Sequence, residues 1–450
     1  MIQWLRSTAC VVLWLTLAGS RGFGEDAVDR LTPERLAATR AAIERLQGER
    51  RACESPRPWK DVRANLHVHS AFSHDSRGTV EEIVAAAKKV GTQVVMFTEH
   101  PADHYDYFRD GHQGVRDGVL LIPGAETKGL LVFPHHSLQG VESETPQGYS
   151  NLVRGRGGLS FVSHLEERMD WTLTGVTGVE IYNTHADFKG ERRLVKSLAN
   201  PLWLLQAADL FRRYPQEAFS ALQDYPADYL RRWDELQAAA PHVGVSANDA
   251  HQNVGVVIRL GDAGKPVLED GGGKKLLDLE PLFIAPWVRI PADAKPGDVL
   301  FDWKMDPYEC SLRHVATHLL ASDLTEAAVW ESLEQGRAFV AFDWMADATS
   351  FDVRIEQAGI RREMGSRASW SDDARLIGCA PLSAQWRLYR DGQFVHEHAG
   401  RTFDQPLDRP GRYRVELWLV IADQPRPWIL SNPFYVVDDR RGPLRGPTPP

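Results

Sequence analysis

Short apolar runs alternate with helical segments from residue 62 to about residue 260, and this alternation constrains the fold most strongly. Runs such as "QVVMFTEH" and "LSFVSH" are almost continuously apolar, as strands buried on both faces are. The segment "TVEEIVAAAKKVG" between two such runs has a helix start at Thr79 and a helix stop at Gly91. The alternation therefore predicts a parallel α/β sheet or barrel, to which we assign residues 62–345.

The sequence changes character on either side of this region. After residue 350, stretches such as "GRYRVELWLVI" alternate apolar and polar residues between "RDG" and "RPG" turns. This predicts an antiparallel β-sandwich at 350–437, followed by a disordered tail at 438–450. Before the α/β region, Thr32 and Pro33 form a helix start, so we expect an N-terminal helical lead at 26–61.

The first 25 residues have the layout of a secretory signal peptide: one basic residue, a short apolar run, then small residues. An uncleaved N-terminal anchor is the alternative. No other run is long enough to span a membrane, so we expect a periplasmic or secreted protein with no stable membrane span in its mature chain. The remaining cysteines, Cys53, Cys310 and Cys379, are odd in number and widely spaced, and predict neither a disulfide framework nor a cysteine metal site.

The chain of 450 residues has a net charge of −9 at pH 7, which argues against non-specific binding to nucleic-acid backbones. No specific nucleic-acid partner is indicated. The oligomeric state has no signal in the sequence.

Histidines and carboxylates stand at the ends of the predicted strands. His67 and His69, at i and i+2, point to the same face of one strand. In parallel α/β folds, the carboxyl ends of the strands are where sites are built. Each residue alone has an ordinary explanation as a surface or capping group, but their coincidence at strand ends predicts one shared site. The other members of this set are Asp75, His100, Glu126, His164, Asp249 and His251.

The motifs "LHVHSAFSHD", "TEH", "PGAE", "FVSH" and "NDAH", in this order, resemble those of the PHP (polymerase and histidinol phosphatase) family of metal-dependent phosphoesterases. The resemblance covers residues 62 to about 260. It implies a distorted (β/α)7 barrel that holds two or three divalent metal ions. The motif "TEH" departs from the commoner "TDH", but its middle residue is not a ligand in the family.

The resemblance also implies how the ligands are grouped. A first ion would take His67, His69, Glu126 and Asp249. A second ion would share Glu126 and take His164 with a histidine of "FPHHSLQG", for which we choose His135 over His136. A third would take Asp75, His100 and His251. We expect His185 and His74 to be ordinary histidines without partners in the site.

Histidine and carboxylate ligands suit zinc, manganese or iron. Two ions that share Glu126 would hold a bridging hydroxide as the nucleophile, so no catalytic residue of the protein is assigned. The expected substrate is a phosphorylated small molecule or a phosphodiester. The alternatives are a PHP-like hydrolase of a non-phosphate bond and a ligand-binding module with a non-catalytic metal site.

Overall fold

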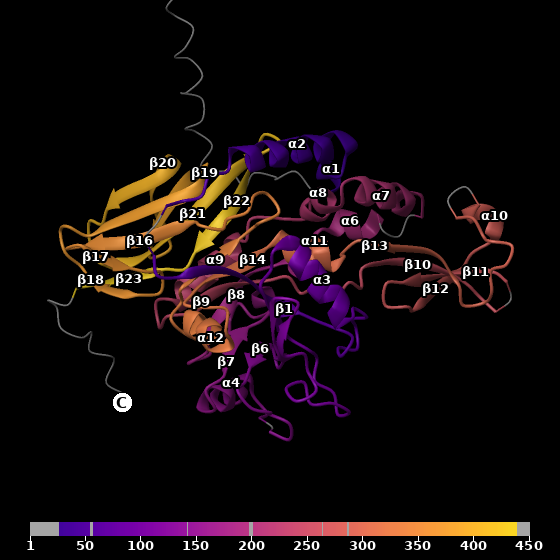
Figure 1. The fold of residues 1–450 in the computed structure, drawn as a ribbon, viewed down its shortest axis with the longest axis horizontal. Helices are drawn as coiled ribbons and strands as arrows, with labels where there is room; N and C mark the ends of the chain where they lie inside the picture. Colours follow the sequence, from indigo (N-terminus) through magenta and orange to yellow (C-terminus); the bar gives the residue numbers. More distant parts are fainter. Residues whose placement is uncertain are drawn as a thin grey trace, which may run out of the picture.

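The computed structural model describes residues 27–54, 57–141, 143–197, 201–262, 264–285 and 288–438. The expected signal peptide and all but the first residue of the expected tail lie outside these ranges. None of the helices in the described ranges is both long and apolar enough to cross a membrane. Figure 1 shows an α/β body with the C-terminal strands at one end and a small sheet at the other.

The α/β body begins with a buried strand and a well-capped helix. β1 is buried from Val62 to Val68, because its side chains on both faces are covered. In α3 (Val80–Val90), Thr79 and Glu82 form a capping box and Gly91 ends the helix in the left-handed conformation, as predicted. The strands of this half of the body are β1 (Lys60–Val68), β2 (Val94–Phe97), β3 (Gly114–Arg116), β4 (Val119–Ile122), β14 (Ala316–Ala321) and β15 (Ala338–Ala341).

A second sheet of five strands supplies the other half of the body. Its order is β5-β6-β7-β8-β9, with β7, β8 and β9 parallel to one another. Two single bridges connect the two sheets. One joins Val68 at the end of β1 to Ala250 after β9, and the other joins Glu99 after β2 to Ala125 at the start of β5. The strands are β5 (Ala125–Thr127), β6 (Leu130–Phe133), β7 (Leu159–Val162), β8 (Gly178–Asn183) and β9 (Val243–Ala247).

The strand pairs do not close into a barrel among the described residues. Every strand has two hydrogen-bonding edges, and those of β1 are taken by the parallel β2 and the antiparallel β14. Among the described residues, the segment that continues β9 is therefore bridged to the end of β1 only between Val68 and Ala250. The expected closed (β/α)7 barrel is not confirmed; the observed body is a mixed α/β arrangement of two sheets.

The C-terminal strands continue the large sheet of the body. β15 pairs antiparallel with β22 through Phe339–Ser431, Val340–Leu430 and Ala341–Ile429. One hydrogen-bonded sheet thus runs from β1 through β14 and β15 into the C-terminal strands, and the expected C-terminal β-sandwich is not confirmed. These strands are β16 (Asp352–Gln357), β17 (Ile360–Arg362), β18 (Arg367–Ser369), β19 (Arg375–Arg390), β20 (Gln393–Pro406), β21 (Gly411–Ile421), β22 (Gln424–Ser431) and β23 (Phe434–Val437).

The N-terminal segment contacts both the α/β body and the C-terminal strands. Thr32 caps α2 (Pro33–Glu49), as predicted, and α2 contacts both α8 and β21. A disulfide joins Cys53, just after α2, to Cys379 on β19, a pairing that the spacing of the cysteines does not predict. Among the described residues, Cys310 is a buried free cysteine.

The remaining helices cover the two sheets, and a small sheet projects from the body beyond them (Figure 1). The small sheet, which we call the arm, has the order β12-β11-β10-β13. Its elements are β10 (Gly255–Leu260), β11 (Pro266–Asp270), β12 (Lys275–Asp278), α10 (Pro281–Ile284) and β13 (Val299–Lys304). The other helices are α1 (Ala27–Arg30), α4 (Pro146–Gly155), η1 (Leu165–Glu167), α5 (Thr184–Gly190), α6 (Arg192–Ser197), α7 (Pro201–Arg213), α8 (Pro215–Ser220), α9 (Ala227–Leu236), α11 (Tyr308–His314) and α12 (Glu326–Glu334).

Candidate metal centre

Two histidines at the end of β1 present their ring nitrogens to one point. Nδ1 of His67 lies 2.7 Å from Oε1 of Glu180, whose other oxygen accepts hydrogen bonds from the backbone N–H of His164 and the side-chain amide of Asn183. A carboxylate only accepts, so Nδ1–H of His67 donates to it, and Nε2 is the ring nitrogen that can offer a lone pair to a metal. Nε2 of His67 faces Nε2 of His69 at 3.1 Å.

Ser73 orients His69 in the same way. Its hydroxyl donates to Glu99 at 2.7 Å, so its oxygen accepts from Nδ1–H of His69 at 3.0 Å. Glu99, the middle residue of "TEH", also accepts from the backbone N–H and the hydroxyl of Ser70. It therefore supports a ligand through Ser73, which agrees with the expectation that it is not itself a ligand.

The facing nitrogens of His67 and His69 are surrounded by further acceptors. Oδ1 of Asp249 and Oε2 of Glu126 lie 3.2 Å and 3.3 Å from Nε2 of His67. Four groups that mainly accept would repel one another unless a positive charge lies among them. The ligand atoms of His67, His69, Glu126 and Asp249 all lie within 4.8 Å of one another, which suits a single cation.

Glu126 faces two sides of the site. Its Oε1 lies 3.2 Å from Nε2 of His164, whereas its Oε2 faces His67 and, at 4.0 Å, Nε2 of His100. Nδ1 of His164 is 3.2 Å from Oε1 of Glu166, and Oε2 of Glu166 accepts from the hydroxyl of Tyr229. Glu126 is thus placed to contact two ions with its two oxygens.

A second group lies beside the first. Oδ2 of Asp75 is 3.4 Å from Nε2 of His100 and 3.3 Å from Nε2 of His251. The ring of His251 stacks on that of His69 with centroids 4.0 Å apart. The ligand atoms of His69, Asp75, His100 and His251 again lie within 4.8 Å of one another. Since Nδ1 of His69 is bound to Ser73, its Nε2 can serve only one of the two groups.

Unpartnered buried atoms show that these residues fit a metal. Among the described residues, Oδ1 of Asp75, Oδ1 of Asp249 and Nε2 of His251 are buried and have no hydrogen-bond partner. A buried polar atom without a partner is costly, and native proteins rarely keep one without a reason. Each of these atoms belongs to a residue of the cluster and is of a type that binds divalent cations. The residues present therefore fit the metal ions that the sequence predicts.

The backbone is held in unusual conformations at two of these residues. His164 and Asp249 have φ angles of 45° and 49°, in the left-handed region that residues other than glycine rarely adopt. Such conformations persist where the surrounding structure enforces them, and they gather at functional sites. Both residues lie two positions beyond the buried ends of β7 and β9.

The charges in the cluster shift the pKa values of its members. Burial lowers the pKa of His67, but Asp249 and Glu126 raise it well above its ordinary value. Burial and the nearby His251 hold the pKa of His69 well below its ordinary value. Burial also lowers the pKa of His164, but its hydrogen bonds with Glu126 and Glu166 raise it to about 10. In the metal-free protein, protons therefore occupy part of the space that suits cations.

The structure brings together eight of the nine predicted ligands. They are His67, His69, Asp75, His100, Glu126, His164, Asp249 and His251. His135 instead lies 40% exposed against α12, with its ring stacked on Trp330 and Nδ1 3.9 Å from Glu326. It is not placed with the other eight.

The sequence analysis missed His185, which lies where a second histidine is needed. Its Nδ1 is 3.1 Å from Oδ2 of Asp249, and its ring meets that of His164 edge-on. Asn183 caps α5 by accepting from the backbone N–H of His185, which fixes the start of this helix at the end of β8. A histidine two residues beyond a buried strand was the available signal. His185 thus lies beside Asp249 and His164, where His135 was expected.

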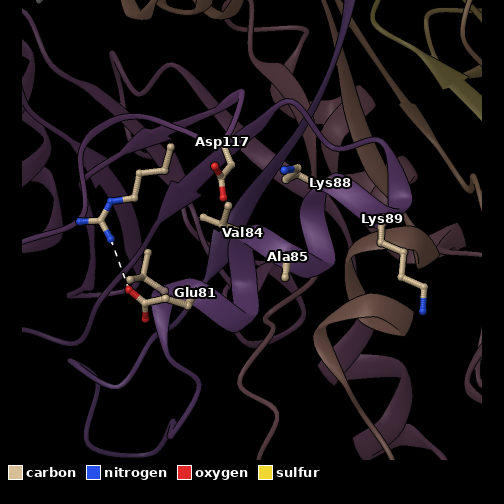
Figure 2. A pocket seen from close by; sticks show the side chains of 8 residues that line it. Glu81, Val84, Ala85, Lys88, Lys89 and Asp117 are labelled. Atoms are coloured by element: carbon tan, nitrogen blue, oxygen red, sulfur yellow. Dashed lines mark ion pairs between the residues drawn. The ribbon is translucent and has the colours of Figure 1, made fainter.

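A groove elsewhere on the surface is separate from this site. It lies between α3 and the turn after β3, and Figure 2 shows its charged rim. Arg116 pairs with Glu81 across it at 3.7 Å. Its described lining includes none of the clustered ligands, so we assign it no part in the metal centre.

The comparisons with known proteins give one family match and a likeness to a solved structure. The sequence matches no curated protein. Among solved structures, it is similar to a two-domain protein from Bacteroides vulgatus described as containing a predicted PHP-like metal-dependent phosphoesterase, at 11% identity and a TM-score of 0.35, over 85% of this chain and 98% of that one. Residues 65–221 match the model of the PHP domain. This range contains six of the eight clustered ligands predicted from the sequence and also His185.

Proposed function

We propose that this protein is an exported, metal-dependent phosphoesterase. The observation that carries the proposal is the convergence of histidines and carboxylates from separate strand ends on one buried cluster within and beside the PHP domain. Phosphate esters are the substrate class that the family match favours. Whether the ester is a monoester or a diester has no signal in this geometry.

The residues divide into sets that would each hold one ion. His67, His69 and Asp249 would hold the first, and Asp75, His100 and His251 another. His164 and His185 would hold a third between Glu126 and Asp249, in place of the set with His135. We propose zinc, manganese or iron, since mixed histidine and carboxylate ligands suit these ions. Bound there, divalent ions supply Lewis acidity toward phosphate oxygens and lower the pKa of water.

The other residues of the chain hold the ligands in place. Glu180 and Ser73 fix His67 and His69 with their Nε2 atoms facing the cluster. Glu166 fixes His164 and is itself held by Tyr229. Ligands that are locked in this way bind metal in a defined geometry and change little during a reaction.

Two features support export. Residues 1–25 have the layout of a signal peptide. The Cys53–Cys379 disulfide belongs to an oxidising compartment, because such bonds are rare in the cytosol of most organisms. N-terminal sequencing of the protein from its native host tests this part: a mature chain outside the cytoplasm that begins near residue 25 is expected. Recovery of intact Met1 in the cytosolic fraction contradicts it.

The activity is tested with Glu126→Gln. This change removes a negative charge and weakens the contact to two ions, so bound metal and phosphoester turnover should both fall, turnover by about 100-fold or more. The measurements are metal content by mass spectrometry and hydrolysis of a panel of phosphomonoesters and phosphodiesters. Glu397→Gln, on the exposed face of β20, is the matched control and should match the wild type. A wild-type protein that binds metal but hydrolyses none of the panel would reject the proposed activity.

A further inference from the structure

A small pocket opens beside the candidate metal centre, and its walls come from five segments of the chain. They are α5, the end of α8 with the residues after it, the loops after β9 and β13, and α11. Two of its lining residues, His185 and Asp249, belong to the metal cluster. A group bound in this pocket would therefore lie next to the ions.

Most of the surface that lines the pocket is apolar, although polar residues also line it. Phe219, Leu222 and Met305 are almost completely buried and belong to the core cluster below it. Phe188 and Val254 are partly exposed and pack against the same cluster. Burying an apolar group against such walls is favourable because it removes apolar surface from water.

Two of the polar side chains in the wall away from the cluster, Asn248 and Asp306, are already bound within the protein. The side-chain amide of Asn248 donates to the carbonyl oxygens of Ser311 and Val315. The carboxylate of Asp306 accepts from the backbone N–H groups of Asn253 and Val254. A polar guest would lose its bonds to water and find few free partners here, which is costly. The pocket therefore favours a guest without charge or strong hydrogen-bonding groups.

We infer that this pocket is the leaving-group subsite of the enzyme, and that it selects phosphate esters whose alcohol part is apolar, such as an aryl ester. The inference rests on the proposed phosphoesterase function. In this arrangement the phosphate lies at the cluster, and the apolar part of the ester extends past Asp249 and His185 toward Phe188 and Val254. Phe188 and Val254 then determine specificity, and neither contacts the phosphate.

The test compares an aryl with an alkyl compound on manganese-loaded full-length protein. Turnover is measured with phenyl phosphate and methyl phosphate, and binding with the non-hydrolysable phenylphosphonate and methylphosphonate. Phe188→Ala removes one wall, and Val254→Trp fills the mouth while keeping the backbone N–H that Asp306 needs. Since the intrinsic reactivity of each ester is the same in every variant, a change in the phenyl-to-methyl ratio reports the pocket alone.

We expect the phenyl-to-methyl ratio of kcat/KM, and that of the two phosphonate affinities, to fall about tenfold in both variants. Phe394→Ala, an exposed phenylalanine on β20, is the matched control and should keep the wild-type ratios. Unchanged ratios in both variants, or no binding of either phosphonate, overturn the subsite even if the esters are hydrolysed. If neither ester is hydrolysed but the phosphonate ratio falls as expected, the proposed activity fails and the subsite stands.

Discussion

Glu180 receives the Nδ1–H of His67 at 2.7 Å, and neither side chain is exposed to solvent. The same carboxylate also accepts from the backbone of His164, so one buried group positions ligands on two strands. This arrangement fixes the tautomer of His67 and increases the basicity of its Nε2.

Glu180→Gln should therefore weaken metal binding without removing a ligand. The amide keeps the size of the side chain, but it carries no charge to stabilise His67 and can offer N–H to Nδ1. We expect metal affinity to fall by about 10-fold to 100-fold. Calorimetric titration of the metal-free protein measures this, and unchanged affinity would contradict the positioning role. Glu356→Gln, on β16, is the control.

His185→Ala and His135→Ala distinguish the two assignments of the second histidine. His185 lies 3.1 Å from Asp249, whereas His135 stacks on Trp330. We expect His185→Ala to lose about one equivalent of bound metal and His135→Ala to lose none. Metal content after dialysis is the measurement. The opposite result would show that His135, and not His185, is the ligand.

Metal loading should release protons. Burial lowers the pKa of His251, but Asp75 and Asp249 raise it to about 9, and His164 is raised to about 10. Both rings are thus protonated at pH 7 in the metal-free protein and must lose a proton to bind metal. We expect about two protons released from these rings at pH 7, and manganese affinity that rises from pH 6 to pH 8. Affinity that does not change with pH would contradict this. Proton release in weakly buffered solution measures the effect, and His164→Asn should release about one proton fewer.

His318, which is not one of the clustered residues, should make the unfolding free energy depend on pH. It is buried between Asp61 and Asp343, at 2.7 Å and 2.9 Å. Burial lowers its pKa, but Asp343 and Asp61 raise it to about 9, above the value of about 6.5 in the unfolded chain. Its contribution to stability is therefore complete below about pH 6.5 and is lost as the pH rises toward 9.

The expected loss is about 2.5 kcal/mol of unfolding free energy between pH 6.5 and pH 9. His318→Gln should be less stable at pH 6.5, and it should lack this part of the pH dependence. Urea unfolding at both pH values measures the difference. A wild type and a variant with parallel pH profiles would show that His318 does not carry the charge.

The sequence predicted which residues gather in the cluster better than it predicted the choice between neighbouring histidines. Histidines and carboxylates at the ends of apolar strands identified most of the cluster, because strand ends are fixed by a local pattern. His135 and His185 could not be separated in this way, since both follow an apolar run. The two histidines differ in what lies next to them in the fold. His135, after β6, packs on Trp330 of α12, whereas His185, at the start of α5 capped by Asn183, lies beside Asp249.

The fold was predictable in its elements and less so in its connections. The capping box at Thr79 and the start of α2 at Thr32 are local and appear as predicted. The open arrangement depends on which strand occupies each edge of β1, and β14 comes from more than 240 residues further along the chain. No local pattern encodes a pairing across that distance.

The pairing of β15 with β22 has a consequence for how the protein can be divided. Phe339 and Val340 on β15 are completely buried, and the C-terminal strands cover the edge that they form. A chain cut after Ala341 would leave this hydrophobic edge bare, and bare edges of this kind recruit other chains. The part that carries the cluster is therefore not an independent folding unit. A duplicated, fused or truncated form can keep it folded only if the C-terminal strands are included.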